Sequence, residues 1–261
     1  MLCEKIISVM NKLAPENSAL DWDNVGLLVG DKNSDIKKII IGLDLTDKII
    51  DQAIKYKANM IITHHPIFFH GTKKITGDLG ENRRVVRLIK NDICFYAAHT
   101  NLDMADNVGT NAVLADLLEL DNIEALVELD NCAMGRVGYL KKTHTLEEFS
   151  VFVKNKLRLD KIFFYGDKKV EIKKIGLCTG SASGLKYFLL AKQKDCDVYL
   201  TGDIKYHDAL LTLDLNLNLI DVTHYASERI FAPVLKNELK KILPELDIIC
   251  SDDNFDLINI I

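Results

Sequence analysis

The chain has 261 residues, of which 48% are hydrophobic, and it carries a formal net charge of −5 at pH 7. A chain of this length and composition can bury a substantial core and fill two domains of ordinary size. The negative charge argues against a protein that wraps nucleic acid by charge alone, so nucleic acid is not indicated as a partner. The apolar stretches are short and charge-flanked, and residues 1–20 lack a signal-peptide pattern, which predicts a cytoplasmic protein without membrane spans.

The first half of the chain alternates strand and helix patterns in the manner of a doubly wound α/β domain. The expected elements are strand 38–44, a helix from Thr46, strand 59–63, helix 84–90, strand 93–98 and helix 108–120. A strand, a helix and a second strand in succession form a βαβ unit, so we expect parallel strands in this half.

The second half begins near residue 125, after the polar pair at residues 121–122. A strand is expected at residues 134–140, and the capping box from Thr145 to Glu148 opens a helix. Six cysteines are scattered singly without a Cys-x-x-Cys pair, which favours neither a disulfide framework nor a zinc ribbon.

The pattern of the second half repeats that of the first. Residues 172–177 resemble the segment that begins at Ile36, and residues 196–201 resemble residues 58–63. We therefore predict two similar α/β lobes, residues 1–125 and 126–261, with mixed, largely parallel sheets. The C-terminal segment is expected to pack back on the first lobe.

Three clusters of histidines and acidic residues each follow an apolar run. The clusters are His64 with His65, His99 with Asp103, and His224 with Glu228. Each run is expected to be a strand that ends in a loop, and in open α/β sheets ligands and metals bind at that edge. Nitrogen and carboxylate ligands without thiolate suit zinc, manganese, iron or nickel, and a bridging carboxylate allows two ions.

Each cluster also has an ordinary structural interpretation. Adjacent histidines are often incidental, His99 and Asp103 could share a loop hydrogen bond, and the four-residue spacing of His224 and Glu228 is common on helices. The occurrence of all three clusters at strand ends favours a joint metal site in a cleft between the lobes.

Two divalent ions held about 3.5 to 4 Å apart need several imidazoles, terminal carboxylate and a bridging oxygen. The ligand set that this chemistry predicts is His64, His65, Asp103, His224 and Glu228. Adjacent histidines on an extended segment point to opposite sides. Either a sharp turn at His65 and Pro66 brings both into one cavity, or each serves a different ion, and we favour the second with Glu228 between the ions.

His99 is the candidate catalytic residue, either as a hydrogen-bond donor to a ligand or as a proton shuttle. The alternative is that it only orders its loop.

Three further features of the sequence have two interpretations each. Residues 22–26 form a structural turn or a substrate wall, residues 180–184 form a tight turn or a phosphate cradle, and His207 reaches the cleft or lies exposed on a helix.

Four motifs together resemble the family of GTP cyclohydrolase I type 2 homologues, also called the NGG-interacting factor three family. The motifs are residues 22–30, 63–69, 98–103 and 224–228, and they run in the same order over nearly the whole chain. The resemblance implies a two-lobed α/β subunit, a two-metal site between the lobes, the same five ligands and a ring-shaped homohexamer. Family members often have Gly before the last histidine, where this chain has Thr223.

The expected function is that of a metal-dependent hydrolase that acts on a nucleotide or a small phosphorylated or heterocyclic substrate through metal-bound hydroxide. For a GTP cyclohydrolase the target would be C8 of guanine, but none of the motifs identifies guanine. The alternative is a non-catalytic regulatory or scaffold protein that binds metal and forms a ring-shaped oligomer.

Overall fold

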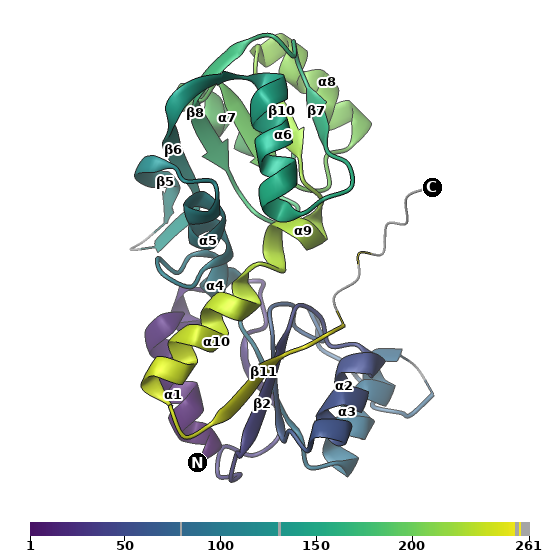
Figure 1. The fold of residues 1–261 in the computed structure, drawn as a ribbon. Helices are drawn as coiled ribbons and strands as arrows, with labels where there is room; N and C mark the ends of the chain where they lie inside the picture. The colour runs from purple at the N-terminus through teal and green to yellow at the C-terminus, as the bar shows by residue number, and fades with distance from the viewer. Residues whose placement is uncertain (79, 130–131, 254–255, 257–261) are drawn as a thin grey trace. The chain divides into compact units, whose positions relative to one another are not determined.

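A computed structural model of the chain describes residues 1–261 except 79, 130–131, 254–255 and 257–261. The chain divides into two compact units: unit 1 comprises Met1–Leu102 and Phe231–Ile261, and unit 2 comprises Asp103–Ile230. Each unit contains one mixed sheet with helices against it (Figure 1). This confirms the expected α/β class with mixed sheets. The candidate ligand Asp103 is the first residue of unit 2.

Unit 1 has a five-stranded sheet in the order β1-β4-β3-β2-β11. The strands are β1 (Gly26–Val29), β2 (Lys38–Gly42), β3 (Met60–Thr63), β4 (Cys94–Ala97) and β11 (Asp247–Cys250). The four strands from β11 to β4 are parallel, and β1 pairs with β4 in the antiparallel direction. Strands β2, β3 and β4 are buried on both faces, which is why their sequences are continuous apolar runs.

Helices cover both faces of the unit 1 sheet (Figure 1). They are α1 (Cys3–Leu13), α2 (Asp47–Tyr56), α3 (Gly80–Lys90) and α10 (Phe231–Ile242), with a short 3-10 turn at Glu16–Ser18 and most of α4 (Thr100–Asp103). The Thr46 side chain accepts a hydrogen bond from the Ile49 amide and begins α2, as the sequence predicts. Buried Ile50 and Ala53 then pack on the sheet.

The sheet of unit 1 is completed by the last part of the described chain. After unit 2, α10 leads into β11, which pairs in parallel with β2 from Asp247 opposite Lys38 to Cys250 opposite Ile41. Phe231 at the start of α10 is fully buried, with its ring centroid 5.6 Å from that of His64. Unit 1 is therefore assembled from two segments that are far apart in the sequence.

Unit 2 has a six-stranded sheet in the order β5-β6-β8-β9-β10-β7, in which β8, β9 and β10 are parallel. The strands are β5 (Asp121–Leu129), β6 (Cys132–Thr145), β7 (Phe163–Tyr165), β8 (Glu171–Leu177), β9 (Val198–Thr201) and β10 (Asn218–Asp221). The polar pair Asp121 and Asn122, expected to mark a boundary, begins β5. Strand β5 lies at the sheet edge with most of its side chains exposed, so polar residues are tolerated there.

Four helices of unit 2 pack on its sheet, and a fifth, α9 (His224–Glu228), lies beyond the ends of β8 and β9. The four are α5 (Thr110–Leu117), α6 (Leu146–Leu157), α7 (Leu185–Gln193) and α8 (Tyr206–Leu215). The predicted capping box opens α6: Thr145 accepts from the Glu148 amide, and the Glu148 side chain accepts from the Thr145 amide. None of the helices in the described part of the chain is long and apolar enough to cross a membrane.

Candidate metal centre

Three histidines of unit 1 gather where two neighbouring parallel strands end. His64 and His65 follow β3, and His99 follows β4. One ligand atom from each of the three imidazoles lies within 4.8 Å of the others. Parallel neighbours end at the same edge of a sheet, so residues far apart in sequence meet there.

A bend after Thr63 brings the rings of His64 and His65 to one side. The His64 amide donates to Gly42 O at 3.3 Å, and the His65 amide donates to Leu43 O at 3.0 Å. The Thr63 hydroxyl closes the bend by donating to His65 O at 2.7 Å. The two ring centroids are 5.1 Å apart, because the strand has ended and its alternation of sides no longer applies.

Each of these imidazoles has its Nδ1 atom next to an oxygen acceptor. His64 Nδ1 lies 2.9 Å from Ala98 O, and His65 Nδ1 lies 2.7 Å from an Asp44 oxygen. His99 Nδ1 lies 2.9 Å from Asp23 Oδ1. An oxygen acceptor at Nδ1 favours the tautomer that carries its proton there, and in metal sites an imidazole held in this way binds the ion through Nε2.

The buried carboxylate of Asp23 fixes the orientation of the His99 ring. The Asp23 side chain is fully buried, and its second oxygen accepts hydrogen bonds from the Thr100 amide at 3.0 Å and the Thr100 hydroxyl at 2.6 Å. Burial raises the pKa of Asp23, but the hydrogen bonds from His99 and Thr100 outweigh this and hold its pKa at about 2. Asp23 is therefore a carboxylate that orients His99, a role that its sequence context as a turn residue does not reveal.

In unit 2, His224 and Glu228 lie on one face of α9, the arrangement that their four-residue spacing gives where a helix is present. His224 Nε2 is 2.9 Å from Glu228 Oε2, and His224 Nδ1 is 2.9 Å from Asp203 Oδ2. Only 3% of Glu228 is exposed. Asp203 follows β9 and serves His224 as Asp44 serves His65, so the same carboxylate-to-imidazole contact occurs in both units.

Helix α9 packs closely against the backbone that follows β8 and β9. The Gly180 amide donates to Ser227 Oγ at 2.9 Å, and a Cβ at Gly180 would overlap a Glu228 carboxylate oxygen. A Cβ at Gly202 would lie 2.5 Å from the His224 amide nitrogen. Residues 180–184 thus serve as a tight turn that lets α9 approach the sheet, and the Gly180 amide is used within the fold.

Asp103 is the third candidate metal ligand of unit 2, after His224 and Glu228. It is 8% exposed and accepts a hydrogen bond from the Thr110 hydroxyl, which lies 2.6 Å from the Thr179 hydroxyl. The Asn111 side chain donates to Asp103 O at 3.0 Å. The start of α5 thus holds both the carboxylate of Asp103, through Thr110, and its backbone, through Asn111.

Asp103 and Glu228 share a neighbour in the core of unit 2, the buried Cys178 thiol. Burial raises the pKa of Cys178, and the charges of Asp103 and Glu228 raise it further. Two buried carboxylates in one neighbourhood repel each other, so a bound cation would lower the energy of this arrangement. His207, by contrast, lies exposed on α8 with its ring against Tyr206.

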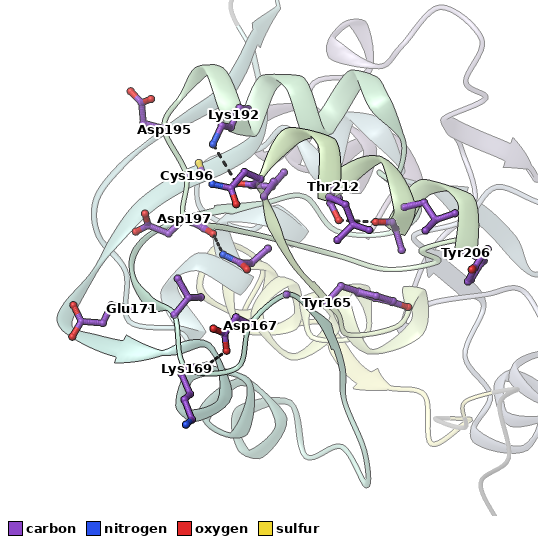
Figure 2. Close-up of a pocket in the computed structure, with 18 residues that line it drawn as sticks. Tyr165, Asp167, Lys169, Glu171, Lys192, Asp195, Cys196, Asp197, Tyr206 and Thr212 are labelled. Carbon is purple, nitrogen blue, oxygen red and sulfur yellow. Dashed lines mark hydrogen bonds between the residues drawn. The ribbon is translucent and has the colours of Figure 1, made fainter.

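A hollow of ≈ 830 Å³ lies elsewhere in unit 2, at the end of the sheet where β9 and β10 begin (Figure 2). None of the predicted ligands lines it. Its polar groups hold the strands together: Asp197 accepts from the Lys173 and Lys174 amides, and the Asn218 side chain donates to Asp197 O. We assign no function to this hollow.

The two units are α/β structures whose buried histidine, aspartate and glutamate groups could hold metal ions. The chain belongs to the Duf34/NIF3 (NGG1p interacting factor 3) family, whose family model matches residues 1–255. This confirms the family resemblance predicted from the motifs.

Relatives and solved structures match over nearly the whole chain. A protein of Clostridium perfringens named GTP cyclohydrolase 1 type 2 homolog is 36% identical over 250 residues, which cover 95% of this chain and 93% of that protein. A Methanocaldococcus jannaschii protein of the same name is 34% identical over 256 residues, covering 97% of this chain and all of its own.

Among solved structures, a Bacillus cereus protein related to NIF3 superposes with a TM-score of 0.93 at 25% identity, covering 100% of this chain and 99% of its own. Reduced HcgD from Methanocaldococcus jannaschii superposes with a TM-score of 0.85 at 34% identity, covering 97% of this chain and 98% of that protein.

Proposed function

We propose that this chain is a dinuclear metal-dependent hydrolase that acts on a nucleotide or on a small phosphorylated or heterocyclic substrate. The proposed metal ligands are His64, His65, Asp103, His224 and Glu228. The proposal requires that the ligands of unit 1 and unit 2 converge on one pair of ions. The names of the relatives, GTP cyclohydrolase 1 type 2 homolog, make GTP the first substrate to test.

The observation that carries the proposal is the orientation of the imidazoles. His65 and His224 each have Nδ1 next to a carboxylate, and His64 has Nδ1 next to a backbone carbonyl. In metal sites such oxygen partners fix the ring and make Nε2 a better ligand. The buried carboxylates supply the negative charge that divalent zinc, iron, manganese or nickel would balance.

Divalent ions held by these groups would lower the pKa of a bound water and polarise the bond to be cleaved. The chain's own contribution to the reaction is proton transfer by His99, whose ring Asp23 fixes from behind. His99 lies within the histidine group of unit 1, and 12% of its side chain is exposed, whereas His64 is fully buried; a proton shuttle needs such access to solvent.

Metal analysis of the purified, metal-loaded chain tests the ligand set. We expect about two ions per chain for the wild type, fewer for His65→Ala and Glu228→Gln, and the wild-type value for His207→Ala, an exposed histidine on α8. One ion or none in the wild type, or equal loading of all three variants, would contradict the proposed site.

A hydrolysis screen with GTP, nucleoside monophosphates and simple phosphoesters tests the activity. We expect His99→Ala to retain its ions and to lose about 10²- to 10⁴-fold in turnover, because it removes the proton-transfer group only. A fully loaded wild type without turnover on any of these compounds would favour the non-catalytic scaffold.

We also propose the ring-shaped homohexamer that the family resemblance implies. Light scattering would then give six times the 29.4 kDa of one chain.

A further inference from the structure

Two large aromatic side chains are exposed beside His99 in unit 1. Trp22, the single tryptophan of the sequence, is 55% exposed, and Phe69 is 46% exposed. Their ring centroids are 6.3 Å apart, and each lies less than 6 Å from the His99 ring, at 5.8 Å for Trp22 and 5.7 Å for Phe69. We call Trp22 and Phe69 the aromatic platform.

The two loops that carry the aromatic platform are fastened to each other and to the histidines. The Asn24 side chain donates to Phe68 O at 2.8 Å, which joins the loop of Trp22 to that of Phe69. Asp23 is bonded to His99, and the Leu20 amide donates to Thr100 Oγ1 at 3.0 Å. The rings are thus held in place before any ligand arrives, which lowers the entropy cost of binding.

The surroundings of the aromatic platform select the chemistry of its ligand. Each platform ring meets His99 nearly edge to face, with interplanar angles of 73° for Trp22 and 67° for Phe69. A purely apolar ligand would cover the imidazole without satisfying its hydrogen bonds, which is costly. A sugar or phosphate alone would leave the aromatic faces in water. A planar nitrogen heterocycle offers an apolar face for the rings and a polar edge for His99.

We propose that the aromatic platform binds a planar nitrogen heteroaromatic ring of the purine type. The inference rests on the proposed function, because it names the part of the substrate that lies next to His99. The residues 22–26 that the sequence allowed as either a turn or a substrate wall serve in both ways: Asp23 and Asn24 shape the turn, and Trp22 forms the wall.

Fluorescence of Trp22 provides a direct test, since no other tryptophan contributes. The full chain, loaded with zinc, is titrated with GMP, AMP and ribose 5-phosphate, with excitation at the red edge of tryptophan absorption. We expect saturable quenching by at least one of the two purine nucleotides and none by ribose 5-phosphate at the same concentrations. Equal responses to all three compounds, or none to either nucleotide, would overturn the proposal.

A pair of matched variants assigns the binding to the platform. Phe69→Leu keeps an apolar side chain but removes the aromatic face, and we expect binding of the responding nucleotide to weaken about 10-fold, as for loss of one stacking contact. Phe163→Leu makes the same change at a 47% exposed phenylalanine of β7 in unit 2 and should leave binding unchanged. Unchanged binding in Phe69→Leu would refute the platform.

Calorimetric titration of Phe69→Tyr, which keeps an aromatic face and should keep near-wild-type affinity, guards against a folding defect in Phe69→Leu. If all three variants bind the nucleotide with the same affinity, the aromatic face of Phe69 makes no contribution to binding, and the platform is refuted. Nucleotide binding to the platform without hydrolysis would count against the hydrolase alone. Metal-dependent hydrolysis without a Trp22 response would count against the platform alone.

Discussion

Thr223, which precedes the candidate ligand His224, has a backbone conformation that residues with a side chain rarely adopt. Its φ is 66° and its ψ is 153°, a region that only glycine occupies readily, at a cost of about 1–3 kcal/mol for other residues. Thr223 also caps α9, since its hydroxyl accepts from the Ala226 amide at 3.3 Å. The glycine that relatives were expected to have here would relax the backbone and lose the cap.

We therefore predict that Thr223→Gly stabilises the protein by about 1 kcal/mol. Glycine relieves the backbone strain, and this gain exceeds two smaller costs: the loss of the cap and the greater entropy of glycine in the unfolded chain. Thr223→Ser, which keeps the hydroxyl and the Cβ, should give no gain. Urea unfolding of both variants measures the effect. A destabilised Thr223→Gly would show that the cap outweighs the backbone strain.

At the scale of elements, α2 and α3 are joined by a charged cluster centred on Asp47. Arg83 Nη2 lies 2.6 Å from one Asp47 oxygen and Arg87 Nη1 lies 2.8 Å from the other. Partial burial raises the pKa of Asp47, but hydrogen bonds from Arg87 and Arg83 outweigh it and lower the pKa below its ordinary value. Asp47 is also the first residue of α2, where a negative charge favours the helix.

A lowered pKa in the folded state means that the unfolded chain binds the proton more tightly. The stability from Asp47 is therefore complete above its unfolded pKa of about 3.9 and is lost as the pH falls through the lower folded value. We predict that Asp47→Asn costs about 1 kcal/mol at neutral pH and less at pH 3. Asp214→Asn, at an exposed position of α8, is the matched control. A difference that persists or grows in acid would contradict this account.

At the scale of the whole molecule, unit 2 is one continuous segment, whereas unit 1 needs both Met1–Leu102 and Phe231–Ile261. We predict that a fragment of residues 103–230 unfolds cooperatively by itself. A fragment of residues 1–102 should not, because it lacks β11 and the buried face of α10, formed by Phe231, Leu235 and Leu239. Circular dichroism during urea unfolding distinguishes the two fragments, and cooperative unfolding of residues 1–102 alone would contradict the prediction.

The contrast between local and distant structure explains how much the sequence could predict. The succession β2, α2, β3 follows from apolar spacing and from the Thr46 cap, and the structure reproduces these elements within a few residues. The spacing of His224 and Glu228 suits one face of a helix, and the structure has the helix α9 there. Such features depend on neighbours in the sequence, which a pattern can display.

Features that depend on distant partners could not be predicted in this way. Asp23 forms a hydrogen bond with His99, which lies 76 residues further along the chain. The residues around Asp23 indicate only a turn and give no sign of this partner. The segment Asp247–Cys250 is apolar enough for a strand, but nothing in it specifies β2 as its neighbour. The bend that turns His64 and His65 to the same side likewise depends on Gly42 and Leu43 of the adjoining strand and loop.

The late arrival of β11 has a consequence for the newly made chain. On the ribosome, the residues of unit 2 emerge before the strand that pairs with the outer edge of β2, from Lys38 to Ile41. Until Asp247–Cys250 have emerged, that unpaired edge of β2 is a template for pairing with other nascent chains. Chaperone dependence and loss to inclusion bodies should therefore be greatest for ribosome-stalled or prematurely terminated products that stop short of residue 247.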